Sequence, residues 1–322
     1  MVSTRVPKGP KGKGLKGVKD KQTMTATNDD ILVDIPDEDI PKLAEMYEKY
    51  IDLLPYAYSM TMTAIEWRRK SNKEYITLTS PYGRWKEDGT VFALVKTCCC
   101  KELYIYSLKM SSKNIYEALT QSRRLKFSQL NFLSCIHEHL YPVVRKAIEE
   151  KQLITTDIDY YMFAITKEEA SKFVIECPPD VYIEKLDKSH AAEVNSRWSH
   201  RFQNSEKFVA LLMDMNDAYG VFLKSNGELV AWVLLCALGQ LAILQTKEGY
   251  ERRGYASLVT QYMSKELAKK GHNAFATVLV HNTPSVSMFK KLGFQILGHA
   301  YYMLLNLIDN EILRDSLISE IM

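Results

Sequence analysis

The sequence predicts a mixed α/β (α+β) protein of two similar halves, each a mixed central sheet flanked by helices. The main observation is the order of the expected elements. On both sides of Pro178 and Pro179 this order is close to strand, two helices, three strands, helix, strand. The length of 322 residues exceeds the roughly 100–200 of one domain, and the 46% hydrophobic content suits a globular chain.

The first half is expected to fold over residues 29–177. Asp39 can cap its first helix, and Pro55 is expected to end that helix. Strands are expected at 31–35, 91–100, 103–108, 130–135 and 160–165, and helices at 39–54, 60–70, 114–124 and 138–151.

The second half is expected to fold over residues 178–322. A turn at 225–227 joins two of its strands. Strands are expected at 181–186, 219–223, 229–237, 239–246, 274–280, 294–297 and 300–305, and helices at 191–198, 205–215, 254–270 and 283–292. The halves share little identity, so the pattern indicates a duplicated fold.

Positive charge is concentrated at the start of the chain. Residues 1–21 hold seven lysines and arginines against Asp20 alone, so this segment carries +6 and the other residues about −3. A body of that charge does not favour nucleic acid as a partner. Residues 1–28 are expected to be a disordered basic tail. A mitochondrial presequence is the alternative, but the glycines and proline there oppose an amphipathic helix.

The six cysteines lack the paired spacing of a zinc site, and no metal site is predicted. Cys98, Cys99 and Cys100 fall in an expected strand, which would point their side chains to alternating faces. No signal peptide is visible, and no apolar run approaches the roughly 18 residues that cross a bilayer. The chain is therefore interpreted as an intracellular protein, cytoplasmic or mitochondrial, with reduced thiols and no membrane span.

The segment QTKEGYERRGYASLV, residues 245–259, has the composition of an anion-binding loop before a helix. Gly254 permits close approach of the backbone, and Ala256 is too small to obstruct a ligand. The N–H groups at the start of the helix point at an anion, and Arg252 and Arg253 add positive charge. The segment is suited to cradle a pyrophosphate; an ordinary turn with solvated arginines is the alternative.

A second segment, HNTPSVSMFKKLGF at residues 281–294, follows a strand and opens a helix. Asn282 can cap this helix, and Gly293 can end it. Met288, Phe289 and Leu292 give the helix an apolar face.

Together the two segments resemble the Gcn5-related N-acetyltransferase (GNAT) superfamily. Residues 251–256 match its Arg/Gln-x-x-Gly-x-Gly/Ala cofactor motif, and residues 282–294 match its Asn-x-x-Ser/Ala…Lys-Leu-Gly-Phe motif. Residues 193–213 resemble the Asn-x-x-Trp…Ser-x-x-Phe helical segment of the glycine N-acyltransferase-like family. The resemblance implies two tandem GNAT-like domains, of which the first is a degenerate copy and the second binds acyl-CoA and is catalytic.

The same resemblance implies transfer of an acyl group from acyl-CoA to glycine or another small amine, by direct attack in a ternary complex. Coenzyme A would be held in three places: a strand edge that pairs with pantetheine amides, backbone amides around the pyrophosphate, and a remaining path along the cofactor. The strand edge is formed by Leu244, Gln245 and Thr246. The backbone amides around the pyrophosphate belong to Arg252, Arg253, Gly254, Tyr255, Ala256 and Ser257. The remaining path is lined by Asn282 and Ser285.

Three positions depart from the family pattern. The first motif position, usually Arg or Gln, is Glu251, which is expected to face solvent because it would repel a pyrophosphate. The family's catalytic Glu falls at Gln240, and an amide cannot act as a base. The tyrosine that protonates the leaving thiolate falls at Phe289, which has no hydroxyl.

Candidates for the missing functions are nearby. His281 ends a strand beside the expected cleft and titrates near neutrality, so it is a candidate base; a solvated loop histidine is the alternative. Gln240 could instead orient a water that removes the proton. Trp198, Phe202 and Phe208 lie on segments that would cover the cleft, either as core residues or as the lining of an acceptor pocket.

Two functions are compatible with these features. One is an active acyl-CoA-dependent N-acyltransferase, and the other is an acyl-CoA-binding or regulatory protein that has lost its base. Both require the cofactor segments, whereas Gln240 and Phe289 favour the second.

Overall fold

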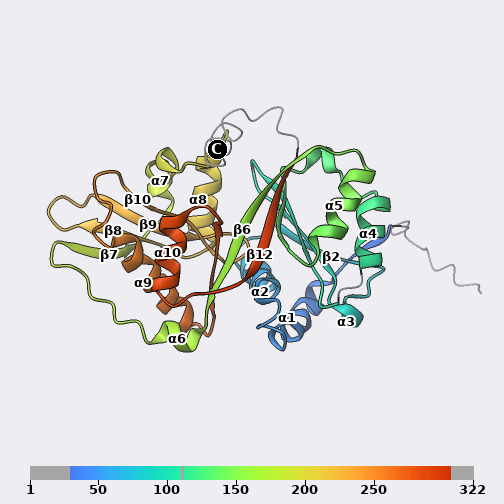
Figure 1. Cartoon of the computed structure of the whole chain (residues 1–322), viewed down its shortest axis with the longest axis horizontal. Helices are drawn as coiled ribbons and strands as arrows, with labels where there is room; N and C mark the ends of the chain where they lie inside the picture. Colours follow the sequence, from blue (N-terminus) through green and yellow to red (C-terminus); the bar gives the residue numbers. More distant parts are fainter. Residues whose placement is uncertain (1–29, 110–111, 306–322) are drawn as a thin grey trace, which may run out of the picture.

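A computed structural model describes residues 30–109 and 112–305 of the chain (Figure 1). The basic tail predicted at residues 1–28 lies outside the described residues. The described strands form one mixed sheet of twelve strands, flanked by helices. This architecture confirms the predicted fold class.

The first half supplies six strands and six α-helices of the described chain. Its strands are β1 (Leu32–Asp34), β2 (Ile76–Pro81), β3 (Val91–Lys96), β4 (Lys101–Tyr106), β5 (Phe132–His137) and β6 (Thr155–Ile165). Its helices are α1 (Ile40–Glu48), α2 (Pro55–Lys70), α3 (Trp85–Asp88), α4 (Ser112–Gln121), α5 (Tyr141–Glu150) and α6 (Lys167–Ser171).

The second half supplies six further strands and four α-helices of the described residues. Its strands are β7 (Val181–Lys185), β8 (Ala218–Leu223), β9 (Leu229–Leu235), β10 (Leu241–Thr246), β11 (Ala274–Leu279) and β12 (Gln295–Leu305). Its helices are α7 (Ala191–Arg197), α8 (Ser205–Met215), α9 (Tyr255–Lys269) and α10 (Thr283–Lys291).

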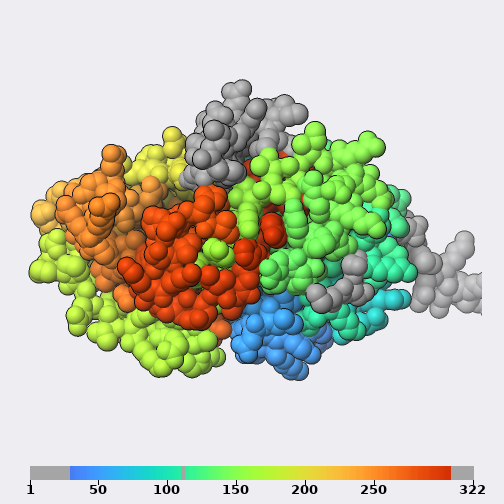
Figure 2. Space-filling view, in the orientation of Figure 1, coloured from blue at the N-terminus to red at the C-terminus, as the bar shows by residue number. Residues whose placement is uncertain are grey.

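The two halves exchange their last strands. The order across the sheet is β1-β2-β3-β4-β5-β12-β6-β11-β10-β9-β8-β7, so β12 pairs with β5, and β6 pairs with β11. Figure 1 shows β6 (green) and β12 (red) side by side at the centre, and Figure 2 shows the red surface in contact with green and blue surface of the first half. The sheet therefore continues across both halves, and the boundary at Pro178 stays a prediction about the order of the domains along the chain.

Helix α2 connects the two halves beneath the sheet. The buried hydroxyl of Tyr56 donates to the backbone oxygens of Phe163 in β6, at 3.2 Å, and Ala276 in β11, at 3.0 Å. A Cβ built on Gly239 would lie 2.3 Å from Oγ of Ser59 in α2, so only glycine fits this approach. Helix α2 thus holds the β9–β10 turn and the start of β11 in fixed positions.

Two predictions for the first helices are wrong. Helix α1 ends at Glu48, and Pro55 begins α2 instead of ending α1. Proline is favoured at the first helical position because an N–H there has no partner within the helix. The carboxylate of Asp39 occupies the cap position but makes an ion pair with Lys42 at 2.7 Å in place of a cap hydrogen bond.

Three predictions for strands also need correction. Strand β2 was not predicted, although Ile76 and Leu78 alternate with threonines at the period of a strand. Strand β3 ends at Lys96, so the cysteine run lies in the following turn and not in a strand. The two closing strands are one continuous strand, β12, whose pairing with β6 shifts register between Ile296 and Gly298.

No helix among residues 30–109 and 112–305 is long and apolar enough to cross a membrane.

Candidate active site

Strands β10 and β11 diverge and open a cleft. They run parallel but are in register only at Leu241 and Ala276. The pairing of β10 with β9 shifts register between Ala242 and Gln245, and Ile243, between them, has a φ of 50°. A bulge of this kind bends a strand and redirects its edge. Beyond Leu241, β10 therefore stays paired with β9 while its other edge faces the cleft.

The cleft has a volume of about 480 Å³ and is lined by residues of both halves. Five of the predicted site residues line it: Gln240, Leu244, Gln245, Asn282 and Ser285. The first half contributes Cys100, Glu102, Tyr104, Phe132, Ile158 and Tyr160, which sequence reasoning did not connect with a site. The strand exchange explains this contribution, because β12 and β6 place β4 and β5 on the same sheet as β11.

Gln240 is buried at the closed end of this divergence. Its Nε2 donates to Oγ1 of Thr277 at 3.0 Å and to the hydroxyl of Tyr302 at 3.2 Å. Its Oε1 is buried and has no hydrogen-bond partner among the described residues. A buried acceptor without a partner is costly, so the polar cluster of Gln240, Thr277 and Tyr302 is incompletely paired.

Tyr302 places a second polar group beside Gln240. Burial raises the pKa of the Tyr302 hydroxyl well above its ordinary value. The hydroxyl therefore stays protonated near neutral pH and is able to donate a hydrogen bond or a proton. Phe289, at the position of the family's tyrosine, is buried and lines the cleft without a polar group.

An aromatic wall covers one side of the cleft. The rings of Trp198 and Phe208 are stacked with centroids 6.2 Å apart, and Phe202 lies 6.1 Å from each. All three line the cleft. Phe208 is also packed into the core, so the wall is both a structural support and an apolar surface for a ligand.

The loop before α9 has the geometry of an anion-binding turn. Gly254 is the N-cap of α9 with a φ of 84°, and Arg252 and Gly249 also have positive φ values, 61° and 85°. A Cβ on Gly254 would meet no described atom within 4 Å, so the space in front of the helix is open to a ligand. The first N–H groups of a helix have no partner within it and attract anions.

Glu251 does not compete for this space. Its side chain is exposed and accepts a hydrogen bond from the N–H of Gly249 at 2.8 Å, within the loop. Arg252 and Arg253 are also exposed. The guanidinium of Arg253 lies 5.0 Å from the ring centre of Tyr250 and donates to the backbone oxygen of Gly249 at 3.2 Å.

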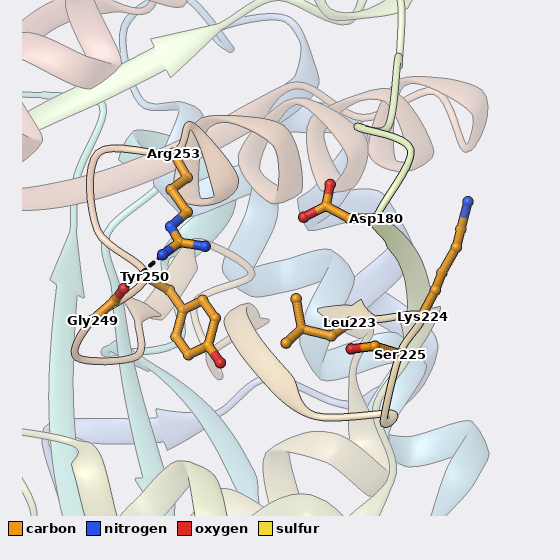
Figure 3. A pocket seen from close by; sticks show the side chains of 7 residues that line it. All are labelled: Asp180, Leu223, Lys224, Ser225, Gly249, Tyr250 and Arg253. Carbon is orange, nitrogen blue, oxygen red and sulfur yellow. Dashed lines mark hydrogen bonds between the residues drawn. The ribbon is translucent and has the colours of Figure 1, made fainter.

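A second, open hollow lies beside the loop (Figure 3). Its volume is about 720 Å³. Arg253 and Tyr250 lie on one side of it, and the start of β7 and the β8–β9 turn lie on the other. The lining residues are Asp180, Leu223, Lys224, Ser225, Gly249, Tyr250 and Arg253.

The predicted site residues thus fall into three groups. Gln240, Leu244, Gln245, Asn282 and Ser285 meet in the cleft. Thr246 and the loop residues 252–257 lie outside its lining, with the loop at the start of α9. His281 is exposed in the turn after β11 and is not among the residues that line the cleft, so the structure does not bring it to Gln240. Asn282 caps α10 by accepting from the N–H of Ser285 at 3.2 Å, as predicted.

Glu102 is the carboxylic acid of the cleft lining, and sequence reasoning missed it. It is a lone carboxylate in the apolar run of β4, on the same face as Tyr104. A charge that alternates with aromatic residues in a strand is the signal that could have marked it.

Comparisons with known proteins agree with this description. Residues 218–303 match the family profile described as FR47-like protein, and residues 31–147 match a domain of unknown function, DUF5645. A 112-residue stretch is 28% identical to glycine N-acyltransferase-like protein 2 of Homo sapiens; it covers 34% of this chain and 38% of that relative.

Two solved structures cover most of the chain. A Drosophila protein superposes with a TM-score of 0.79 at 20% identity, covering 86% of this chain and 99% of its own. A GCN5-related N-acetyltransferase from Sphaerobacter thermophilus gives a TM-score of 0.53 at 10% identity, covering 85% and 94%. The chain has a GNAT-like fold. Its resemblance to the GNAT superfamily, and within it to glycine N-acyltransferase-like proteins, is confirmed.

Proposed function

We propose that this protein is an acyl-CoA-dependent N-acyltransferase that transfers the acyl group to glycine or another small amine. The observation that carries the proposal is the divergence of β10 from β11 beyond Leu241, which leaves a strand edge free along a cleft. Such an edge is suited to pair with the amide groups of an extended pantetheine arm. Leu244 and Gln245 lie on this edge.

Coenzyme A fits the residues present. The open space in front of Gly254 and the N-terminal amides of α9 suit a pyrophosphate, with Arg252 and Arg253 nearby as cations. Asn282 and Ser285 line the cleft between this loop and Gln240. When bound, acyl-CoA supplies an activated thioester carbonyl.

The chain's own groups near Gln240 suit the acceptor and the leaving group. Gln240 lines the cleft beside the Tyr302 hydroxyl, where an amine and the thioester would meet. The Tyr302 hydroxyl, kept protonated by burial, can donate to a departing thiolate. Holding the two reactants together in the cleft supplies a large part of the rate enhancement.

The rival proposal is an acyl-CoA-binding or regulatory protein without catalysis. The observation in its favour is that Gln240 has no carboxylate, so the family's base is missing from this strand. Both proposals require the cofactor loop and the cleft.

Thiol release from short- and long-chain acyl-CoA, measured over a panel of small amines that includes glycine, separates the two. Amine-dependent thiol release and an N-acylated product by mass spectrometry are expected. Micromolar binding of acyl-CoA without turnover with any amine would establish the binding protein instead. Absence of both binding and turnover would contradict both proposals.

A further inference from the structure

Glu102 is the acidic side chain of the first half that reaches the cleft. Its Oε1 accepts a hydrogen bond from Oγ of the buried Ser134 at 2.9 Å, which holds the carboxylate in place. The side chain is half-buried and lines the cleft together with Tyr104 of the same strand. The carboxylate is therefore fixed by β5 and open to whatever occupies the cleft.

The carboxylate lies close to the Gln240 end of the cleft. Its negative charge contributes to raising the pKa of the Cys236 thiol to about 12, after burial. The N–H of Cys236 in turn donates to the backbone oxygen of Gln240 at 3.0 Å. Tyr104, beside Glu102, is also near the hydroxyl of Tyr302, which bonds Gln240. Glu102 and Gln240 thus belong to one cluster formed by both halves.

No cation of the described chain neutralises this carboxylate. Among the ion pairs that residues 30–109 and 112–305 form with one another, none includes Glu102. A carboxylate removed from water without a counter-ion is unfavourable, so a cationic ligand group in the cleft is strongly favoured. The ammonium group of a ligand supplies such a charge.

The rest of the lining selects against a second carboxylate. None of the described lining residues is lysine or arginine; His200 is the histidine among them. The carboxylate of an amino-acid acceptor would therefore lie near Glu102 without a guanidinium or ammonium partner. The wall of Trp198, Phe202 and Phe208 offers an apolar surface to the remainder of the acceptor.

We infer that Glu102 of the first half binds the ammonium group of the acceptor and acts as the general base, and that the acceptor is a hydrophobic amine without a carboxylate. The inference rests on the proposed function. The ammonium loses one proton to Glu102, and the neutral nitrogen attacks the thioester carbonyl. The C–N bond forms and the C–S bond breaks, a second nitrogen proton passes to the thiolate as CoA-SH, and Glu102 returns its proton to solvent.

Glu102 is the carboxylic acid of this cluster, and its surroundings act on its pKa in opposite directions. Burial raises the pKa of the Glu102 carboxyl above its ordinary value, and hydrogen bonds from Ser134 and Tyr104 oppose this rise. Burial also raises the pKa of three groups that feel the charge of Glu102, namely Cys100, Tyr104 and Cys236, and of Tyr302 in the same lining. His200 lies in that lining as well. A carboxylate with a raised pKa is a stronger base than an exposed one.

The test compares wild type, Glu102→Gln and the control Glu184→Gln, which changes an exposed carboxylate on the edge strand β7. Thiol release is measured with phenethylamine, phenylalanine and glycine from pH 6 to 10. Wild type is expected to prefer phenethylamine. Glu102→Gln is expected to lose about 100-fold in kcat near pH 7 and to recover as the free amine forms at high pH. Its affinity for acyl-CoA, and all properties of the control, are expected to stay unchanged.

Three outcomes would overturn the inference. Equal pH–rate profiles in wild type and Glu102→Gln would exclude Glu102 as the base, while the N-acyltransferase proposal would stand. A preference for glycine or phenylalanine would contradict the acceptor class in the same way. Binding of phenethylamine to wild type with a thioether analogue of acyl-CoA is measured by calorimetry as well. If wild type does not bind phenethylamine, or if Glu102→Gln binds it equally well, the ammonium site is rejected even when no thiol is released. If wild type does not bind acyl-CoA, the proposed function itself is rejected.

Discussion

The two halves use equivalent strand pairs in different ways. Strands β3 and β4 of the first half pair without interruption from Val91 to Lys96, whereas the pairing of β9 with β10 shifts register between Ala242 and Gln245. The chain after β4 is tied back by a hydrogen bond between Ser107 and Thr90 at 2.9 Å. The chain after β10 instead enters a glycine-containing loop that is open in front of α9.

This difference teaches that strand order alone does not open a cleft. The bulge in β10 opens the cleft and the glycine loop follows it, and in the described residues these two features occur together only in the second half. The first half nevertheless contributes to the cleft, because strand exchange pairs β12 with β5, which in turn pairs with β4. The degenerate copy is therefore a wall of the candidate site and the source of its carboxylate.

The largest effect is expected from the glycine that opens the loop. Gly254→Val is expected to weaken CoA binding by at least about 100-fold, or about 2.7 kcal/mol, because a side chain would occupy the space before α9. Gly271→Val is the matched control. Gly271 follows the other end of α9, has a φ of 82° against 84°, and also has open space around it. Calorimetry that shows the same CoA affinity in both variants would reject the loop as the pyrophosphate site.

A second prediction asks which half supplies the carboxylate. Gln240→Glu in the Glu102→Gln background is expected to restore at least about 10-fold of the activity at pH 7, because a carboxylate again lies at the reacting end of the cleft. The gain is expected to shrink towards pH 9, where the amine is largely free. His281→Ala in the wild-type background tests the remaining candidate base. If His281→Ala loses activity at neutral pH and Glu102→Gln does not, His281 in the turn after β11 is the general base.

A smaller effect is expected from the connection between the halves. Tyr56→Phe removes one buried hydroxyl proton, which is shared between backbone oxygens of β6 and β11, and is expected to cost about 1 kcal/mol of unfolding free energy. Tyr58→Phe, on the same helix, removes a half-buried hydroxyl for which no hydrogen bond is found in the described chain. Denaturant unfolding that gives equal losses for both variants would show that the Tyr56 bonds do not stabilise the junction.

The smallest effect concerns stability and pH. Burial raises the folded-state pKa of Glu102 above 4.5, so folding favours its protonated form. The stability associated with this group is full below pH 4.5 and is lost as pH rises through the folded pKa. Glu102→Gln is therefore expected to melt a few degrees higher than wild type at pH 7.5, by a margin that narrows towards pH 4.5. Thermal melts with a constant difference, or the same trend in Glu184→Gln, would contradict the cause.

Local chemistry made much of the second half predictable from the sequence. The start of α10 at Asn282, its end near Gly293 and the glycine cap of α9 at Gly254 depend on residues within a few positions of each other. Helix α8 runs from Ser205 to Met215 as predicted, because its apolar spacing and flanking polar residues are also local signals. The prediction for Pro55 was wrong because proline is compatible with either side of a helix boundary. Which side it takes depends on packing and is not a local signal.

The sequence by itself determined the mixed α/β class and the repeated order of elements, and it marked the cofactor segments as a prediction. Only the tertiary structure decided that Glu102, Gln240 and Tyr302 lie in one cluster. A period of two shows that a residue faces one side of a sheet but not which strand will lie beside it. That neighbour is set by the exchange of β6 and β12, which is a pairing between distant segments and depends on the packing of the whole sheet.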